Sequence, residues 1–299
     1  MALNPKNFIT RTITAIVFAA VMLAGLLWNH WSFLILFSII HFGCWWEYIS
    51  LIEKIHNTSF HINTRLGFML LGFGIMLWFC GQVYEISDYG IKQNFSFPVS
   101  VAGFILLGVG IFQTKRINLK AFGVSALGLL YISLSWGFMI DLGNFIDNTP
   151  GFSFYSVIIP CAIVFSIWTN DTMAYIVGSL IGRTPLSKIS PKKTWEGTIG
   201  GILLCIIVIG TIFSNFSTDI GTPGYHSKFS NQFWFILAAI ASVSGTIGDL
   251  LESWLKRMAK VKDSGSFMPG HGGFLDRFDS MLLAIPAVWI YVKFFISNS

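Results

Sequence analysis

Residues 13–28 read ITAIVFAAVMLAGLLW, a stretch without a single charged side chain. The stretch follows Lys6 and Arg11 and could be mistaken for a signal peptide, but no convincing small-residue cleavage site is evident and a second apolar run follows at once. Over the whole chain, 54% of the residues are hydrophobic, 11% are charged and the mean hydropathy is +0.68. This composition excludes an ordinary soluble domain and predicts a membrane protein whose first span is this stretch.

Apolar runs recur along the whole chain, and about 20 residues suffice for a helix to cross a hydrocarbon core of ~30 Å. The predicted spans are 13–29, 31–50, 66–84, 97–113, 121–141, 155–180, 197–215, 232–248 and 280–297. The sequence shows no internal repeat, no low-complexity tail and no linker. We therefore predict an all-α, polytopic integral membrane protein with about nine transmembrane helices and a single membrane domain over residues 1–299.

The positions of Lys and Arg predict the orientation, because short cytoplasmic loops collect positive charge. With a cytoplasmic N-terminus and nine crossings, sixteen of the nineteen Lys and Arg residues lie on the inner side, and only Lys92, Lys228 and Lys293 lie outside. One missed or invented span would move every later loop to the other side. The net charge of +5 largely restates this loop bias and requires no nucleic-acid partner.

The two halves of the chain differ in polar content. Residues 1–150 have short, chemically plain loops, whereas residues 151–299 carry polar residues inside spans and loops rich in Gly, Lys and Asp. The four cysteines have no CxxC pair and no spacing typical of zinc sites or disulfides, so we interpret them as buried thiols. Functional residues are therefore expected in the second half.

The first polar segment runs from Trp168 to Gly197, and Asn170 and Asp171 lie in an apolar run at its start. An ionisable side chain at membrane depth is costly and usually faces a polar cavity or a partner. Alternatively, the helix ends earlier and Asp171 lies at the interface. Farther on, Lys192 and Lys193 belong to a basic, proline-containing loop, which is by itself weak evidence for phosphate binding.

The second polar segment begins at Asp249. On a helix, Asp249, Ser253 and Lys256 share one face, and Glu252 lies one step round from Asp249. A single stripe of this kind is more often a solvated helix edge than a site. The residues that follow favour a functional site, because glycines in the loop at 263–273 allow backbone N–H groups to approach an anion closely.

A new helix is predicted to begin near Phe274, with Asp276 in its first turn and Asp279 one turn later. A helix N-terminus behind a glycine-rich loop is suited to phosphate. Carboxylates beside it can hold the Mg²⁺ that accompanies nucleotide phosphates.

The stretch SWLKRMAKVKDSGSFMPGHGGFLDRFD, residues 253–279, closely resembles the signature of phosphatidate cytidylyltransferases, also called CDP-diacylglycerol synthases. DTMAY from Asp171 and SPKKTWEG from Ser190 are similar to other segments of that family. Met268 replaces the usual Leu, Ile or Phe but keeps the apolar bulk. The resemblance is specific from about residue 166 to 280, and for the first 150 residues it is limited to span count and general character.

The resemblance implies that CTP and phosphatidic acid react to give CDP-diacylglycerol and pyrophosphate at the inner face of a membrane, here expected to be a bacterial inner membrane. It implies Mg²⁺ as cofactor, with two bound cations of which the second is divalent or monovalent, and a homodimer. Headgroup chemistry can be inferred from these motifs, but acyl preference cannot, because an apolar groove accommodates many chains.

By the same resemblance, Asp249 and Asp276 would hold the metal, with Ser253 and Lys256 completing the catalytic group. Candidates for contacts to phosphates or substrate, or for orienting the basic residues, are Arg257, Lys262, Asp263, His271, Gly272, Gly273, Arg277 and Asp279. A second wall that contacts cytidine or lipid headgroup would consist of Asn170, Asp171, Lys192 and Lys193.

Two alternatives stay open at this point. One is cytidylyl or CTP-dependent transfer to another lipid phosphate or lipid alcohol. The other is an ion-coupled transporter, since intramembrane acids and a basic cytoplasmic mouth are also typical of transporters. The absence of repeated halves and the clustering of polar residues at one membrane face argue against a transporter.

Overall fold

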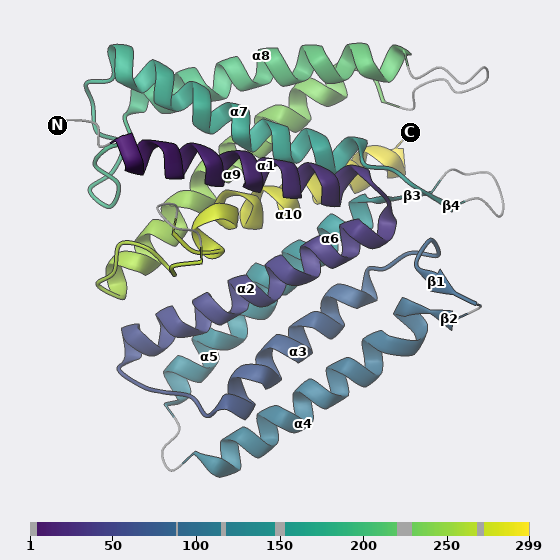
Figure 1. Cartoon of the computed structure of the whole chain (residues 1–299). Coiled ribbons are helices and arrows are strands. Elements are labelled where there is room, and N and C mark those ends of the chain that lie inside the picture. Colours follow the sequence, from purple (N-terminus) through teal and green to yellow (C-terminus); the bar gives the residue numbers. More distant parts are fainter. Residues whose placement is uncertain are drawn as a thin grey trace. The chain divides into compact units, whose positions relative to one another are not determined.

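The computed structural model describes residues 5–87, 89–114, 118–146, 153–219, 229–267 and 272–298 (Figure 1). The fold is all-α apart from two short antiparallel hairpins, β1 (Glu85–Ile86) with β2 (Tyr89–Gly90) and β3 (Asn144–Ile146) with β4 (Ser153–Tyr155). The helices are α1 (Pro5–Leu27), α2 (His30–His56), α3 (Ile62–Trp78), α4 (Phe97–Gln113), α5 (Leu119–Gly128), α6 (Ser135–Leu142), α7 (Ile158–Ile181), α8 (Trp195–Asp219), α9 (Asn231–Met258) and α10 (Leu275–Asn298). A short π-helical segment, Lys92–Ser96, runs directly into α4, and a second one, Leu129–Leu134, joins α5 to α6.

Six helical segments among the described residues are long and apolar enough to cross a membrane, which gives the chain multi-pass character. They are His30–His56, Lys92–Gln113, Leu119–Leu142, Trp195–Asn215, Asn231–Met258 and Leu275–Phe295, and two shorter apolar helices are Thr12–Leu27 and Ile62–Trp78. Each of the nine predicted spans overlaps a helix. Helix α7 does not count among the six, since Asn170 and Asp171 interrupt its apolar sequence.

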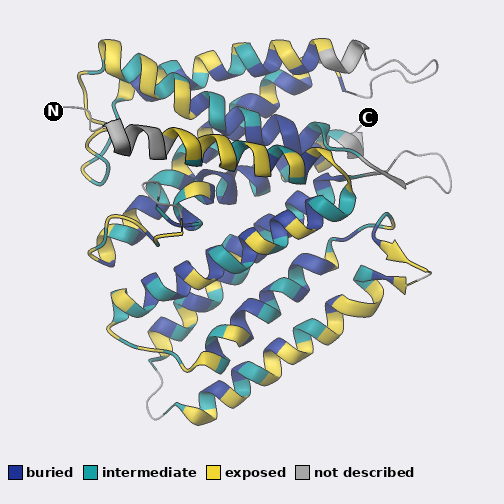
Figure 2. Cartoon of the chain, viewed as in Figure 1, coloured by how far each residue is buried: buried dark blue, intermediate teal, exposed yellow. Residues whose placement is uncertain are grey.

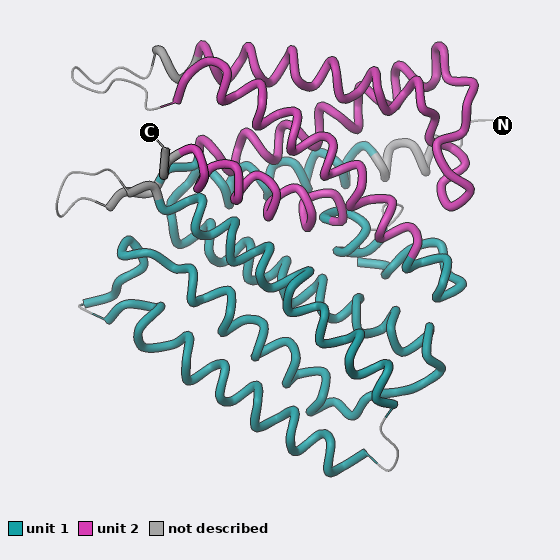
Figure 3. Tube along the Cα trace, turned by 180° about the vertical axis from the view of Figure 1, so that it is seen from behind, with its two compact units in different colours: residues 1–157, 255–278 teal, residues 158–254, 279–299 magenta. Residues whose placement is uncertain are grey.

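The chain divides into two compact units (Figure 3). Unit 1 consists of Met1–Val157 and Leu255–Phe278, and unit 2 of Ile158–Trp254 and Asp279–Ser299. Helices α9 and α10 each contribute residues to both units. The single membrane domain expected from the sequence stays a prediction.

In unit 1, α2 supplies much of the buried core. Trp45 is fully buried and its indole N–H donates to the Ser133 hydroxyl at 2.8 Å, which also lies 3.0 Å from the His41 ring. This pairing matters because a polar atom without a partner in an apolar core is costly. By contrast, α4 presents large exposed apolar side chains, as expected for a face in contact with lipid: Phe97, Phe104, Ile105 and Phe112 (Figure 2).

In unit 2, α7 and α8 pack side by side through small residues. A Cβ at Gly201 would approach the Cβ of Ala174 to 2.7 Å, and one at Gly197 would approach the Ala174 carbonyl oxygen to 2.8 Å. Small residues permit this close approach of helices in membranes. The close pairing brings the loop at 182–194 beside α7.

Backbone hydrogen bonds shape that loop as a narrow turn. The Leu186 N–H donates to the Lys193 carbonyl at 2.7 Å, and the Trp195 N–H donates to the Thr184 carbonyl at 2.9 Å. The Glu196 carboxylate accepts from the Arg183 and Thr184 amides at 3.2 Å. As predicted, the segment around Pro191 is not helical.

Candidate functional site

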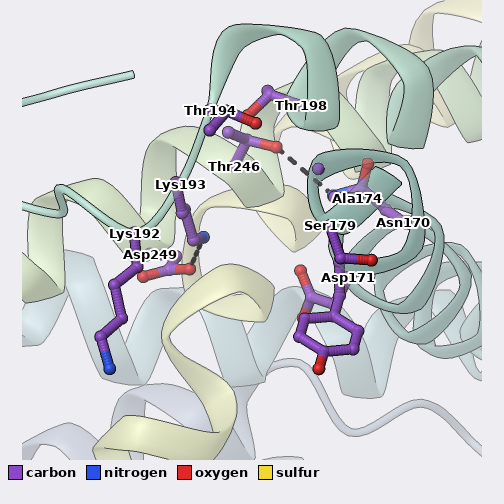
Figure 4. A pocket seen from close by; sticks show the side chains of 12 residues that line it. Asn170, Asp171, Ala174, Ser179, Lys192, Lys193, Thr194, Thr198, Thr246 and Asp249 are labelled. Carbon is purple, nitrogen blue, oxygen red and sulfur yellow. Dashed lines mark hydrogen bonds and ion pairs between the residues drawn. The ribbon is translucent and has the colours of Figure 1, made fainter. Parts of the chain in front are cut away.

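A cavity of about 360 Å³ lies in unit 2 between α7, the loop at 182–194, α8 and α9 (Figure 4). We call it the Asp249 pocket. Its lining consists of Asn170, Asp171, Ala174, Tyr175, Gly178, Ser179, Lys192, Lys193, Thr194, Thr198, Thr246 and Asp249. Five of the predicted site residues, from three segments of the chain, therefore share one cavity.

Asp249 is the anionic centre of this pocket. Its carboxylate forms an ion pair with the Lys193 ammonium and accepts a 3.3 Å hydrogen bond from the Ser253 hydroxyl, one helical turn later on α9. The Asp249 side chain is 20% exposed and that of Lys193 is 33% exposed. Of the stripe predicted for Asp249, Ser253 and Lys256, the contact between Asp249 and Ser253 is observed, and the Lys256 ammonium contacts Asp276. The partner from the basic loop was not foreseen.

Helix α7 continues to Ile181, so the alternative in which it ends before Asp171 is wrong. Asn170 is buried, and its amide N–H lies 3.4 Å from the Thr246 hydroxyl of α9. Its amide oxygen has no hydrogen-bond partner among the described residues. Asp171 is exposed at the pocket, and the Lys192 side chain points away from the Lys193–Asp249 pair (Figure 4).

A second polar centre lies in unit 1 around Asp276. We call it the Asp276 cluster, and its members are Glu47, Lys256, Ser264, Gly273 and Asp276. The Lys256 ammonium lies 2.6 Å from Asp276 Oδ1, and their side chains are 12% and 7% exposed. Asp276 Oδ2 accepts from the Ser264 amide and the Gly273 amide, each at 2.8 Å. The Ser264 hydroxyl lies 2.9 Å from the same oxygen and 2.7 Å from Glu47, and its one proton can go to either carboxylate. Both carboxylate oxygens of Asp276 are therefore engaged.

The helix predicted after the glycine-rich loop is confirmed. Helix α10 begins at Leu275, with Asp276 in its first turn. Gly272 has a φ of +85°, a left-handed conformation that side chains with a Cβ rarely adopt, so glycine is required there. The adjacent Gly273 amide is thereby available to Asp276.

Sequence reasoning missed Glu47 of α2. Its buried carboxylate accepts from the Ser264 hydroxyl at 2.7 Å and from the Phe274 and Leu275 amides at 2.9 Å. A signal was available, because Glu47 is an acid inside an apolar run, and such residues usually have a specific partner. Its partners, more than two hundred residues away, could not be read from the sequence.

The remaining predicted residues are more peripheral or lie outside the described residues. Arg257 is exposed and donates to the Val261 carbonyl at 3.0 Å. Lys262, Asp263 and Arg277 are also exposed, and Asp279 is half-buried. His271 lies outside the described residues, as do the neighbouring positions 268–270. Asp249 belongs to unit 2 and Asp276 to unit 1, and each is described within its own unit.

The Asp249 pocket suits a hard cation better than the Asp276 cluster does. No group of three His, Cys, Asp or Glu side chains fit to hold a metal occurs among the described residues. However, the pocket is lined by the carboxylates of Asp249 and Asp171, the unpartnered amide oxygen of Asn170 and the hydroxyl of Thr246. Oxygen donors of this kind are the ligands of Mg²⁺. At Asp276, Lys256 would have to release one oxygen first.

Comparison with known proteins supplies independent information. The model of the cytidylyltransferase family matches residues 9–295. The phosphatidate cytidylyltransferase of Bacillus subtilis (strain 168) is 33% identical over 192 residues, which are 64% of this chain and 65% of the relative. Phosphatidate cytidylyltransferase 4, chloroplastic, of Arabidopsis thaliana is 47% identical over 124 residues, which are 42% of this chain and 29% of the relative. In both cases the chain spans less than two thirds of the relative's length.

A longer match is the phosphatidate cytidylyltransferase of Staphylococcus saprophyticus, 30% identical over 281 residues, which are 92% of this chain and 95% of the relative. The alignment therefore includes the N-terminal half, where the sequence motifs were silent. Together with the family match over residues 9–295, it shows that the chain belongs to the cytidylyltransferase family.

Proposed function

We propose that this protein transfers the cytidylyl group of CTP to phosphatidic acid, giving CDP-diacylglycerol and pyrophosphate. The observation that carries the proposal is the Asp249 pocket. In it, the two segments that resemble the family, those beginning at Asp171 and Ser190, meet the helix that carries Asp249, and together they supply a carboxylate, an ammonium group and further oxygen donors. Family membership supports the reaction type, and the names of the relatives support the acceptor.

In this reaction a phosphate oxygen of phosphatidic acid attacks the α-phosphorus of CTP. A new P–O bond forms to that phosphorus, and the bond to the bridging oxygen of the β-phosphate breaks, so that pyrophosphate leaves. Such a step depends mainly on positioning and on neutralising phosphate charge. Lys193 and Lys256, each already paired with a carboxylate, are the residues we assign to the phosphate charge.

We assign Asp249 and Asp276 to Mg²⁺ binding, with Asn170 and Asp171 as further oxygen donors at Asp249. When bound, the cations would neutralise the triphosphate and stabilise the attacking and leaving oxygens. The chain's own part is a charge exchange. If Asp249 and Asp276 held the cations, Lys193 and Lys256 would be available to phosphate oxygens, and the bound charges would stay close to neutral.

We further propose nine crossings, a cytoplasmic N-terminus and an active site at the inner face of a bacterial inner membrane, in a homodimer. The overlap of every predicted span with a helix and the bias of Lys and Arg to one side support this topology. Labelling of single cysteines placed at Lys92 and Lys188 tests it. We expect a membrane-impermeant reagent to reach the first only from outside and the second only from inside.

The decisive test uses purified, detergent-solubilised protein with phosphatidic acid, Mg²⁺ and CTP labelled at the α-phosphate. We expect label in the lipid phase, and its loss when EDTA is added. Label in lipid only with another acceptor, such as an isoprenoid phosphate or a lipid alcohol, would replace the proposed substrate. A folded protein that binds no CTP would overturn cytidylyl transfer altogether.

A further inference from the structure

Glu47 is an acid in an otherwise apolar part of α2, and its side chain is buried. A carboxylate in such surroundings is tolerated only where hydrogen bonds or an opposite charge offset the loss of water. Glu47 obtains this from the far end of the chain. Its carboxylate accepts from the Ser264 hydroxyl at 2.7 Å and from the amides of Phe274 and Leu275 at 2.9 Å.

Two of these donors belong to the start of α10. Leu275 is the first residue of α10, and Phe274 directly precedes it. The first amides of a helix have no partner within the helix, and their dipoles favour a negative charge. Glu47 therefore caps α10 from a different helix, a role that a residue of the loop itself usually fills.

The glycines of the loop fit around the same carboxylate. A Cβ at either Gly265 or Gly273 would run into the Glu47 carboxylate oxygens. One turn before Glu47 on α2, Gly43 leaves room for the Phe274 ring, which a Cβ at Gly43 would overlap. Gly265, Gly273 and Phe274 thus all pack closely against the face of α2 that carries Gly43 and Glu47.

Ser264 connects Glu47 to Asp276. Its hydroxyl lies 2.7 Å from Glu47 Oε2 and 2.9 Å from Asp276 Oδ2, and its amide donates to Asp276 at 2.8 Å. Gly273, which packs on Glu47, also donates its amide to Asp276. A change at Glu47 would therefore shift the donors that hold the aspartate.

We propose that Glu47 is a positioning residue for the reaction, one that holds Ser264, Gly273 and the first turn of α10 so that Asp276 is oriented for its task. The assignment to catalysis rests on the proposed function. The N-terminal half then supplies part of the active-site architecture and not only membrane spans.

The experiment compares Glu47→Gln with Glu53→Gln. Glu53 lies on the same helix and accepts from Arg65 at 3.0 Å and from the Phe60 amide at 2.7 Å, away from the loop. Loss of charged hydrogen bonds at Glu47 should lower kcat about ten- to hundredfold. We expect the KM for CTP to change less than about threefold, since an interaction made mainly in the transition state is removed. Glu53→Gln should keep wild-type kcat.

Hydrogen exchange of the Phe274 and Leu275 amides gives a readout that does not depend on activity. We expect exchange about tenfold faster in Glu47→Gln and unchanged in Glu53→Gln, because only the first variant weakens the cap. If Glu47→Gln fails to fold, Ser264→Ala removes only the shared hydroxyl and should still lower kcat about threefold to tenfold.

The outcomes separate the two proposals. A wild-type protein that makes no labelled lipid overturns the proposed function, whereas the exchange rates still report on the cap. An active wild type with Glu47→Gln indistinguishable from Glu53→Gln in kcat and exchange overturns the inference, and so does wild-type kcat in Ser264→Ala.

Discussion

The Asp249 pocket and the Asp276 cluster use the same elements in different ways. Each has an aspartate paired with a lysine and contacted by a serine hydroxyl. The Asp249 side chain is 20% exposed beside a cavity, and its lysine comes from a loop. The Asp276 side chain is 7% exposed, its lysine comes from a helix, and two amides and the shared Ser264 hydroxyl surround its second oxygen.

The difference indicates a division of labour. Asp276 is oriented in advance by a fixed set of donors, which lowers the cost of reorganisation during a reaction. Asp249 forms one ion pair and one hydrogen bond and lies beside a cavity, so it has room to exchange Lys193 for a ligand. If the proposed function holds, the cluster would provide orientation and the pocket would provide space for binding. The following variants test this comparison.

Replacing either aspartate by asparagine should have the largest effect on turnover. We expect Asp249→Asn and Asp276→Asn each to lower kcat by about 10²–10³-fold, because each removes a charge that stabilises the reacting phosphates. The two variants should also differ in stability, because Asp276 is more buried than Asp249. Asp276→Asn removes the anion that lies 2.6 Å from the Lys256 ammonium where both side chains are little exposed, and should lose several kcal/mol of stability. Asp249→Asn should lose about 1 kcal/mol or less.

The measurement is the initial rate of labelled lipid formation together with thermal unfolding in detergent. Asp141→Asn on α6 is the matched control and should keep wild-type turnover. Near wild-type activity in Asp249→Asn or Asp276→Asn would remove that carboxylate from the site, and equal loss of stability in both would contradict the division of labour.

The two lysines should differ in the same sense. Lys256→Met leaves the Asp276 carboxylate 7% exposed without its cation and should destabilise the protein by about 3–5 kcal/mol. Lys193→Met breaks an ion pair whose lysine is 33% exposed, so about 1 kcal/mol or less is expected. We expect Lys193→Met to act mainly on the KM for CTP. Unfolding curves measure the stability of both variants, and steady-state kinetics measure their KM and kcat. A larger loss of stability in Lys193→Met than in Lys256→Met would contradict the expected difference between the two lysines.

Gly273→Ala tests how tightly the cluster is built. A new Cβ would meet the Glu47 carboxylate, so we expect a loss of about 1–3 kcal/mol of stability, as for other overpacked sites, and reduced turnover. Gly108→Ala on α4 is the control, because a Cβ there meets nothing within 4 Å. It should be neutral or slightly stabilising. Glu47→Ala removes the carboxylate that the new Cβ would meet, so adding Gly273→Ala to Glu47→Ala should cost no further activity. A double variant less active than Glu47→Ala alone would contradict the expected clash.

The smallest effect is expected at Asn170. Its buried amide oxygen has no partner among the described residues, so it is placed to bind a ligand in the Asp249 pocket. Asn170→Ala should weaken ligand binding about threefold to tenfold, the value of one ordinary hydrogen bond. Titration of the protein with CTP and Mg²⁺ measures it. Unchanged affinity together with lower stability would assign Asn170 to structure alone.

Much of the helical framework could be predicted from the sequence. Each apolar run overlaps a helix, α10 begins within a residue of its predicted start, and Asp249 and Ser253 share a face because they lie four residues apart on α9. The partners of the charges could not be predicted. Lys193 and Asp249 are 56 residues apart, and Glu47 and Ser264 are 217 residues apart.

The hydropathy pattern, the helices and the chemistry available in each segment can be read from the chain alone, because helix formation and span length depend on neighbours within a few residues. It also supplied the motifs that resemble those of a family. The pairing of Lys193 with Asp249 and the capping of α10 by Glu47 depend on the packing of the folded chain. The physical reason is that hydrogen bonds reach about 3 Å, so a partner is selected by how helices pack and not by distance along the chain.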